Sequence, residues 1–434
     1  MARKIDKEIL RLAWPAIATN ITTPLLSLVD VAIVGHIGSA AFIGAVTVGG
    51  AMLNMLYWLF GFLRAGTSGI TAQAFGAGDR QGQMLALARS LGSAAIIGIL
   101  IIALSSPLGE LVLNFMDAQA DTASLARRYF SVAVWGAPGL LGTYALSGWF
   151  LGMQSSRPAM WMSIIANSAN IVLSTTFVFA LGMGIEGVGL GTAIAQWISL
   201  AVGVAMLPRY CHGAPKGWST MLLQWAGLKR LFAVNADIML RTLCLIAVTL
   251  WFTHAGAVLG DSVLAANALL MQLFMLFSYF MDGFAYAGEA LAGKFAGGHD
   301  ATSLRTLVRT LLRWGTALSL IASLLYFTCG EWFLSLLTAD ANVLDVAAEY
   351  KLWAVAVPLA GFMSFIWDGI YIGLVKTRLM LLTMAVSMVI FYAIYFLAHP
   401  YLGNHGLWLA FIAYLATRGL LQSALYSRLL HHLG

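Results

Sequence analysis

Apolar segments long enough to cross a membrane follow one another along almost the whole chain. A helix needs roughly 20 residues to span about 30 Å of hydrocarbon, and glycine, proline and charged residues mark the breaks between the segments. The pattern predicts twelve helices, over residues 8–34, 40–68, 86–105, 124–152, 158–180, 186–208, 228–254, 262–292, 307–328, 347–374, 379–398 and 405–430. We therefore expect an all-α integral membrane protein with about twelve transmembrane helices.

The second half of the chain repeats the first at a spacing near 220 residues. Pro138 has a counterpart in Pro358, and Gly152 in Gly373. Because six helices per half return the chain to its starting side, the repeat is predicted to be parallel, with two lobes related by a pseudo-two-fold axis along the membrane normal. The predicted domains are an N-terminal six-helix lobe, a cytoplasmic linker and a C-terminal six-helix lobe, over residues 1–208, 209–228 and 229–434.

Composition and charge agree with a membrane protein. The chain is 60% hydrophobic and 10% charged, which excludes an ordinary soluble domain. Lys and Arg gather at the N-terminus and in alternate loops, so the positive-inside rule predicts that both termini face the cytoplasm of a bacterial inner membrane. The net charge of +6 reflects these loops and gives no reason to expect nucleic acid as a partner. The first segment has no cleavage site and is expected to remain as a helix.

No pattern of catalytic or metal-binding residues is present in the sequence. The three cysteines are scattered without metal spacing, and there is no Walker loop, nucleophile elbow or His-Glu metal motif. We expect neither an enzyme nor a bound cofactor or metal, so an energy source other than ATP is implied.

Asp30 is the foremost candidate for chemistry, because an ionisable residue inside a membrane helix is expensive and by default functional. Pro15 and Pro24 precede it in the same helix, and each removes a backbone donor and bends the helix. A kink beside a titratable group is a candidate switch. The alternative is a helix-end carboxylate that simply lies near water.

Polar residues on the fifth and sixth predicted helices are candidate partners for Asp30. Asn167, Asn170 and Ser174 recur at spacings of three and four, so they share one face of a helix. Thr192 adds a hydroxyl on the sixth helix. The alternative role for this stripe is helix packing alone.

With these residues in place, the chain resembles the multidrug and toxic compound extrusion (MATE) family over essentially its full length. Segments beginning at Asp237, Asn267, Asp282 and Leu402 are similar to the DNA-damage-inducible F (DinF-like) branch. The resemblance implies a proton-coupled antiporter in which protonation of Asp30 rearranges its network with helices five and six, bends the first helix and expels drug from the N-lobe.

The sequence departs from the family pattern at one position. Several members carry a second Asp where this chain has Ser174, so a sodium site like theirs would lack one negative charge. We therefore expect the proton motive force to drive transport, with sodium less favoured.

The C-terminal half offers Asp282 and Asp368 as a second candidate site. Asp368 matches an acid that the NorM branch uses for cations, but the Glu that accompanies it there has no counterpart here. Arg241 is a candidate counter-ion for Asp282. A buried structural ion pair is the alternative for this group.

Methionine and aromatic residues suit a site that accepts varied organic cations, although the same residues fill any membrane core. Those considered as lining are Met52, Met55, Tyr57, Trp58, Met153, Trp161, Met162 and Phe177. The expected partners are small-molecule drugs and organic cations, protons and membrane lipids, and the protein is expected to be a monomer.

Two other classes of protein remain open. One is a lipid-linked precursor flippase, which would need more intramembrane cations than Arg64 and Arg241; the other is an intramembrane enzyme or receptor.

Overall fold

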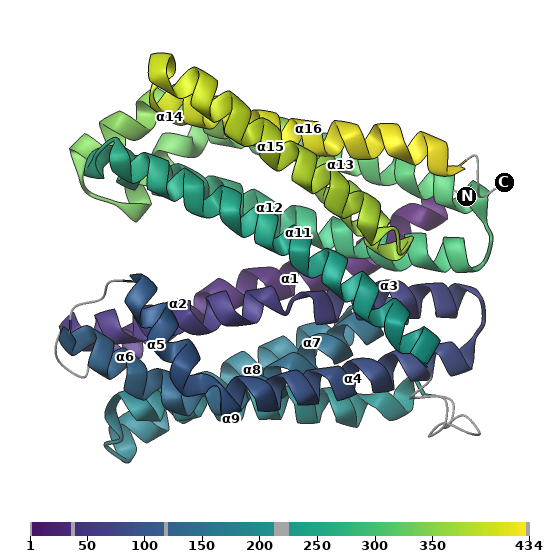
Figure 1. Ribbon diagram of the computed structural model, residues 1–434, viewed down its shortest axis with the longest axis horizontal. Helices are drawn as coiled ribbons and strands as arrows, with labels where there is room; N and C mark the ends of the chain where they lie inside the picture. The colour runs from purple at the N-terminus through teal and green to yellow at the C-terminus, as the bar shows by residue number, and fades with distance from the viewer. Residues whose placement is uncertain (1, 36–39, 117–119, 212–224, 431–434) are drawn as a thin grey trace. The chain divides into compact units, whose positions relative to one another are not determined.

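The computed structural model describes residues 2–35, 40–116, 120–211 and 225–430, and in these ranges every regular element is a helix (Figure 1). The α-helices of the first half are α1 (Ala2–Gly35), α2 (Ala40–Leu59), α3 (Phe62–Gly76), α4 (Arg80–Ala103), α5 (Ser105–Met116), α6 (Ala120–Ala133), α7 (Ala137–Gly152), α8 (Arg157–Thr175) and α9 (Gly184–Met206). Those of the second half are α11 (Trp225–Val258), α12 (Asp261–Gly297), α13 (Ala301–Leu337), α14 (Ala341–Gly373), α15 (Thr377–Leu402) and α16 (Asn404–Leu430).

Each predicted range overlaps a described helix, although α13 extends nine residues past its predicted end, and the all-α membrane fold is confirmed. Within the described ranges, nine helical spans are long and apolar enough to cross a bilayer. The predicted helix 40–68 consists of α2 and α3, which meet where the amides of Phe60 and Gly61 bond to carbonyls only three residues back. The short helix α5 lies in a region that was expected to be a loop.

The chain divides into two compact units, which we call the N-lobe (residues 14–235) and the C-lobe (residues 1–13 and 236–434). These limits differ from the predicted lobes, because the start of α1 packs with the second half of the chain. Within the C-lobe, Lys294 Nζ lies 3.1 Å from Glu8 Oε2, and Trp314 donates a hydrogen bond of 3.0 Å to Asp6 Oδ1. Polar contacts of residues far apart in sequence therefore fix the first turns of α1.

The backbone repeats at an interval of 221 residues. Asp79 caps α4 by accepting a hydrogen bond from Gly82, and Asp300 caps α13 in the same way through Ser303. Gln154 and Val375, each two residues after the last residue of α7 or α14, both adopt a positive φ, at 64° and 54°. A β-branched residue rarely adopts this conformation. Its occurrence at Val375 indicates that the surrounding helices, and not the residue's own preference, determine this turn.

Two glycines in each half allow one pair of helices to touch backbone to backbone. A Cβ added to Gly148 of α7 would lie 2.1 Å from the carbonyl oxygen of Arg64 in α3, and one added to Gly369 of α14 would lie 2.1 Å from that of Ala285 in α12. Gly152 and Gly373 follow four residues later and face similar obstacles. This is the small-xxx-small spacing through which membrane helices approach closely.

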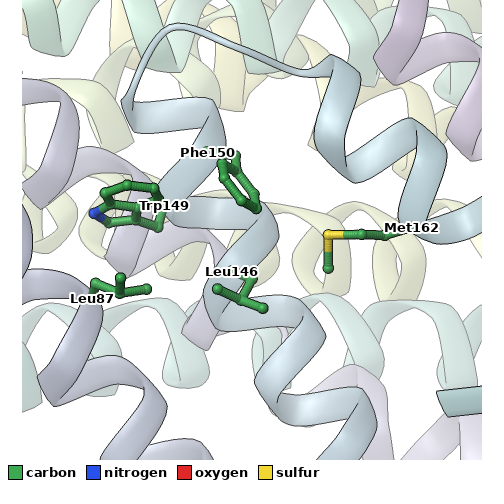
Figure 2. Packing of buried hydrophobic residues seen from close by; sticks show 5 residues of the cluster. All are labelled: Leu87, Leu146, Trp149, Phe150 and Met162. Atoms are coloured by element: carbon green, nitrogen blue, oxygen red, sulfur yellow. The ribbon is translucent and has the colours of Figure 1, made fainter. Parts of the chain in front are cut away.

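A cluster of large buried side chains fills the N-lobe between α4, α7 and α8 (Figure 2). Its members are Leu87, Leu146, Trp149, Phe150 and Met162, each at most 3% exposed. The indole of Trp149 donates a hydrogen bond of 2.8 Å to the carbonyl oxygen of Gln83, so its one polar atom is satisfied. Met162, considered above as cavity lining, instead belongs to this packed core.

Candidate functional site

The polar stripe on α8 meets α9 inside the N-lobe. Asn170 Nδ2 donates a hydrogen bond of 2.9 Å to Thr192 Oγ1, which in turn donates to the carbonyl oxygen of Val188 at 3.1 Å. The helices approach closely here because Gly191 has no side chain: a Cβ at that position would lie 2.4 Å from Ser174 Oγ. The predicted grouping of Asn170, Ser174 and Thr192 in one place is thus what the structure has.

This group contains acceptor oxygens that the described part of the chain leaves unused. Asn170 and Ser174 are 1% and 0% exposed, yet Asn170 Oδ1 and Ser174 Oγ have no hydrogen-bond partner there. A buried polar atom without a partner costs about 1–3 kcal/mol. Asn170 Oδ1 can only accept a hydrogen bond, so a donor brought by another residue would be favoured at this point.

Helix α1 borders the stripe. Asn167 Nδ2 donates to the carbonyl oxygen of Thr22 at 3.4 Å, which connects α8 to α1. Pro15 lies within the helix, and the hydroxyl of Thr19 donates to its carbonyl oxygen. Asp30 and Pro24 also lie on α1, but their side chains are outside those that the structure describes.

A second polar group lies in the C-lobe, around Asp368 of α14. Arg241 of α11 forms a hydrogen-bonded ion pair with Asp368 Oδ2, and Arg418 of α16 lies 3.5 Å from the same oxygen. Gln422 Nε2 donates to Asp368 Oδ1 at 2.8 Å, and Arg418 donates to Ser364 Oγ at 2.7 Å. Both oxygens of Asp368 therefore accept hydrogen bonds from protein donors.

The structure adds to the expectations for this lobe in three ways. The ion pair shown for Arg241 is with Asp368, whereas the sequence suggested Asp282 as its partner. Arg418 and Gln422 were missed, although an Arg within the apolar segment 405–430 is the kind of intramembrane ionisable residue that signals a site. Arg418 also adds a buried cation to Arg64 and Arg241, the two intramembrane cations that the flippase alternative would have to rely on.

Comparisons with known proteins place these features in context. The MatE family model matches residues 15–176 and again residues 236–397, so the matched halves begin 221 residues apart, as the backbone repeat does. The DNA damage-inducible protein F of Escherichia coli (strain K12) is 37% identical over 424 residues, which cover 98% of this chain and 92% of that protein. A probable multidrug resistance protein NorM of Bradyrhizobium diazoefficiens is 27% identical, covering 93% and 89% of the two chains.

Among solved structures, the Vibrio cholerae MATE transporter VcmN in its bent form aligns with a TM-score of 0.87 at 18% identity. The alignment covers 100% of this chain and 98% of that one. At this identity the likeness concerns the fold alone, and it extends over all of the described helices.

Proposed function

Since the chain belongs to the MatE family of transporters, which are not enzymes, we propose that it is a secondary active antiporter that exports organic, often cationic, compounds in exchange for protons by alternating access. It would lie in the bacterial inner membrane as a monomer with both termini in the cytoplasm. The relative named as a probable multidrug resistance protein supports drugs as substrates.

The observation that carries the proposal is the buried pair of Asn170 and Thr192 with its unused acceptors. In our proposal Asp30 completes this network. A protonated Asp30 carries an O–H that Asn170 Oδ1 can accept, whereas an ionised Asp30 can only accept hydrogen bonds, from the hydroxyls of Ser174 or Thr192 or from the amide N–H of Asn170. Gain of a proton therefore exchanges one set of partners for another, and helix α1 must move with its side chain.

Protonation of Asp30 is proposed to bend α1 at Pro24 and to shrink the N-lobe cavity, so that substrate leaves as the proton enters. Pro24 supplies the hinge, because proline removes one helical hydrogen bond. The relative from Vibrio cholerae, described as being in a bent form, has the same fold and supports the idea that this architecture admits such a state.

Spin-label distances between α1 and α8 test this mechanism. One label would replace a residue in 25–35, the other would replace exposed Ser168, and Cys211, Cys244 and Cys329 would be removed first. We expect the distance to change between pH 8 and pH 5, and Asp30→Asn to hold the acid distance at both pH values. A control pair from Trp14, which precedes both prolines, to Ser168 should not change. The same geometry at both pH values in a competent, substrate-free protein would reject the bending mechanism while leaving proton coupling open.

The coupling ion is tested by reconstitution with separate gradients. We expect a proton gradient to drive export and an imposed sodium gradient to drive little, because Ser174 offers a neutral hydroxyl where a sodium site would gain from a second carboxylate. Transport that depends on sodium and saturates at physiological sodium would contradict this. Ser174→Asp serves as a gain-of-function companion, in which the appearance of sodium binding would support the assignment.

A further inference from the structure

The polar cluster in the C-lobe carries more positive than negative charge. Arg241 and Arg418 bring two guanidinium charges to the single carboxylate of Asp368, which leaves a net charge of +1 among the three. Asp368 and Arg418 are 7% and 3% exposed, and Arg241 and Asp368 lie in helices that are long and apolar enough to span a membrane. An uncompensated charge is expensive in a medium of low dielectric constant, so this cluster calls for a second anion.

Asp282 of α12 is placed to supply that charge. It interacts electrostatically with Arg418 and with Tyr279. Unlike Asp368 it is only partly buried. An ionised Asp282 would neutralise the cluster, and an incoming anion that displaces it could take over the same role.

The cluster also has the chemistry to hold a carboxylate. The Nε atoms of Arg241 and Arg418 have no hydrogen-bond acceptor among the described residues. Guanidinium groups bind carboxylates in a planar, often bidentate arrangement. Arg418 also lies against the rings of Phe365 and Tyr414, at 5.9 and 5.6 Å from their centroids, so apolar surface adjoins the cation.

We propose that the Arg241–Asp368–Arg418 cluster is a binding site for organic carboxylates, whose anionic group compensates the cluster in place of Asp282. Among the described residues, the charged groups that interact within this cluster are Arg241 on α11, Asp282 on α12, Asp368 on α14 and Arg418 on α16. The proposal concerns the lobe that does not hold Asp30, so it extends beyond proton-coupled export of organic cations and stands independently of it.

Binding of matched probes to the purified full-length protein tests the proposal. The probes are 1-pyrenebutyrate and its neutral amide, followed by fluorescence anisotropy. We expect the carboxylate to bind at least about tenfold more tightly than the amide, since hydrogen bonds to charged groups contribute more than those to neutral ones. Arg418→Gln should weaken carboxylate binding about tenfold and leave amide binding unchanged. Arg309→Gln removes an exposed charge from α13 and should change neither.

Asp282→Asn provides the second, opposite readout. Removal of the competing charge should tighten carboxylate binding severalfold without affecting the amide. Carboxylate binding to Asp282→Asn tests the proposal by itself if Arg418→Gln does not fold. Equal affinity for the two probes, or no tightening in Asp282→Asn, would overturn the proposal.

Competition by phosphate compounds distinguishes a carboxylate site from a lipid headgroup site. Inorganic phosphate and phosphatidylglycerol vesicles are added as competitors of the bound carboxylate probe. We expect an excess of a second organic carboxylate to displace the probe and the phosphate compounds to displace it weakly. Stronger displacement by phosphatidylglycerol would assign the cluster to lipid headgroups and overturn the proposal. Because these assays measure binding and not coupling, their failure would leave the role of Asp30 untouched.

Discussion

Replacing Asp30 by Asn should abolish proton-driven export while leaving the protein folded and inserted. A carboxamide cannot take up a proton, so the proposed exchange of one proton for substrate loses its driving force. At a gradient of two pH units one proton supplies about 2.7 kcal/mol, enough for roughly hundredfold accumulation. Vesicles that contain the variant should therefore show neither substrate movement nor the pH change that accompanies it.

The matched control is Asp121→Asn, which removes an exposed carboxylate in the first turn of α6. This variant should transport like the parent. Monodisperse elution and an unchanged helical circular dichroism spectrum show whether Asp30→Asn is intact. If intact Asp30→Asn protein still moves protons when substrate is added, Asp30 is not the coupling residue.

The substitution Gly369→Ala should destabilise the C-lobe severely, although it adds a single methyl group. The new Cβ would lie 2.1 Å from the carbonyl oxygen of Ala285 and 2.7 Å from its carbonyl carbon. Both are backbone atoms, so α12 and α14 must separate along their contact. Overpacking of a tight core costs about 1–3 kcal/mol, occasionally more, and we expect about 3 kcal/mol here. The measurement is the thermal midpoint in detergent, with a drop of at least about 5 °C.

Gly92→Ala is the control for this change. Gly92 also lies within a helix, α4, but a Cβ there meets nothing within 4 Å. Alanine favours a helix over glycine by about 1 kcal/mol, so this variant should be as stable as the parent or more so. Gly148→Ala, at the equivalent position of the N-lobe, should behave like Gly369→Ala. A Gly369→Ala protein as stable as Gly92→Ala would show that the helices do not depend on this contact.

The fold could be predicted because membrane helices leave a strong signal. Apolar length and glycine or proline breaks located every long helix, although some ends were missed by up to nine residues, as at Leu337 of α13, and the repeat followed from pairs such as Gly152 and Gly373. The closeness of the two backbones at these glycines was not predictable, since it depends on which face of a helix meets a neighbour. Likewise, helix α5 has no membrane-spanning length and gives no such signal.

The candidate site in the N-lobe could be predicted in part. The spacing of Asn170 and Ser174 put them on one face, and their meeting with Thr192 follows from adjacent helices. The C-lobe cluster was harder, because Asp368, Arg241 and Arg418 lie on three helices far apart in sequence. Sequence spacing does not reveal which carboxylate pairs with a given Arg, and for Arg241 Asp282 was as reasonable a partner as Asp368.

The exchange of helix ends between the lobes has a consequence for how the protein is made. Asp6 and Trp314, which contact each other, are separated by 308 residues. At about 5–20 residues per second, a ribosome needs roughly 15–60 s after making the first residue to produce the second. The N-lobe also depends on a late residue. Gly66 packs against Asn235 of α11 so closely that a Cβ at Gly66 would touch the Asn235 side chain. The first residues of the chain therefore wait for the C-lobe to be made, and the N-lobe is complete only once the first part of α11 has been translated.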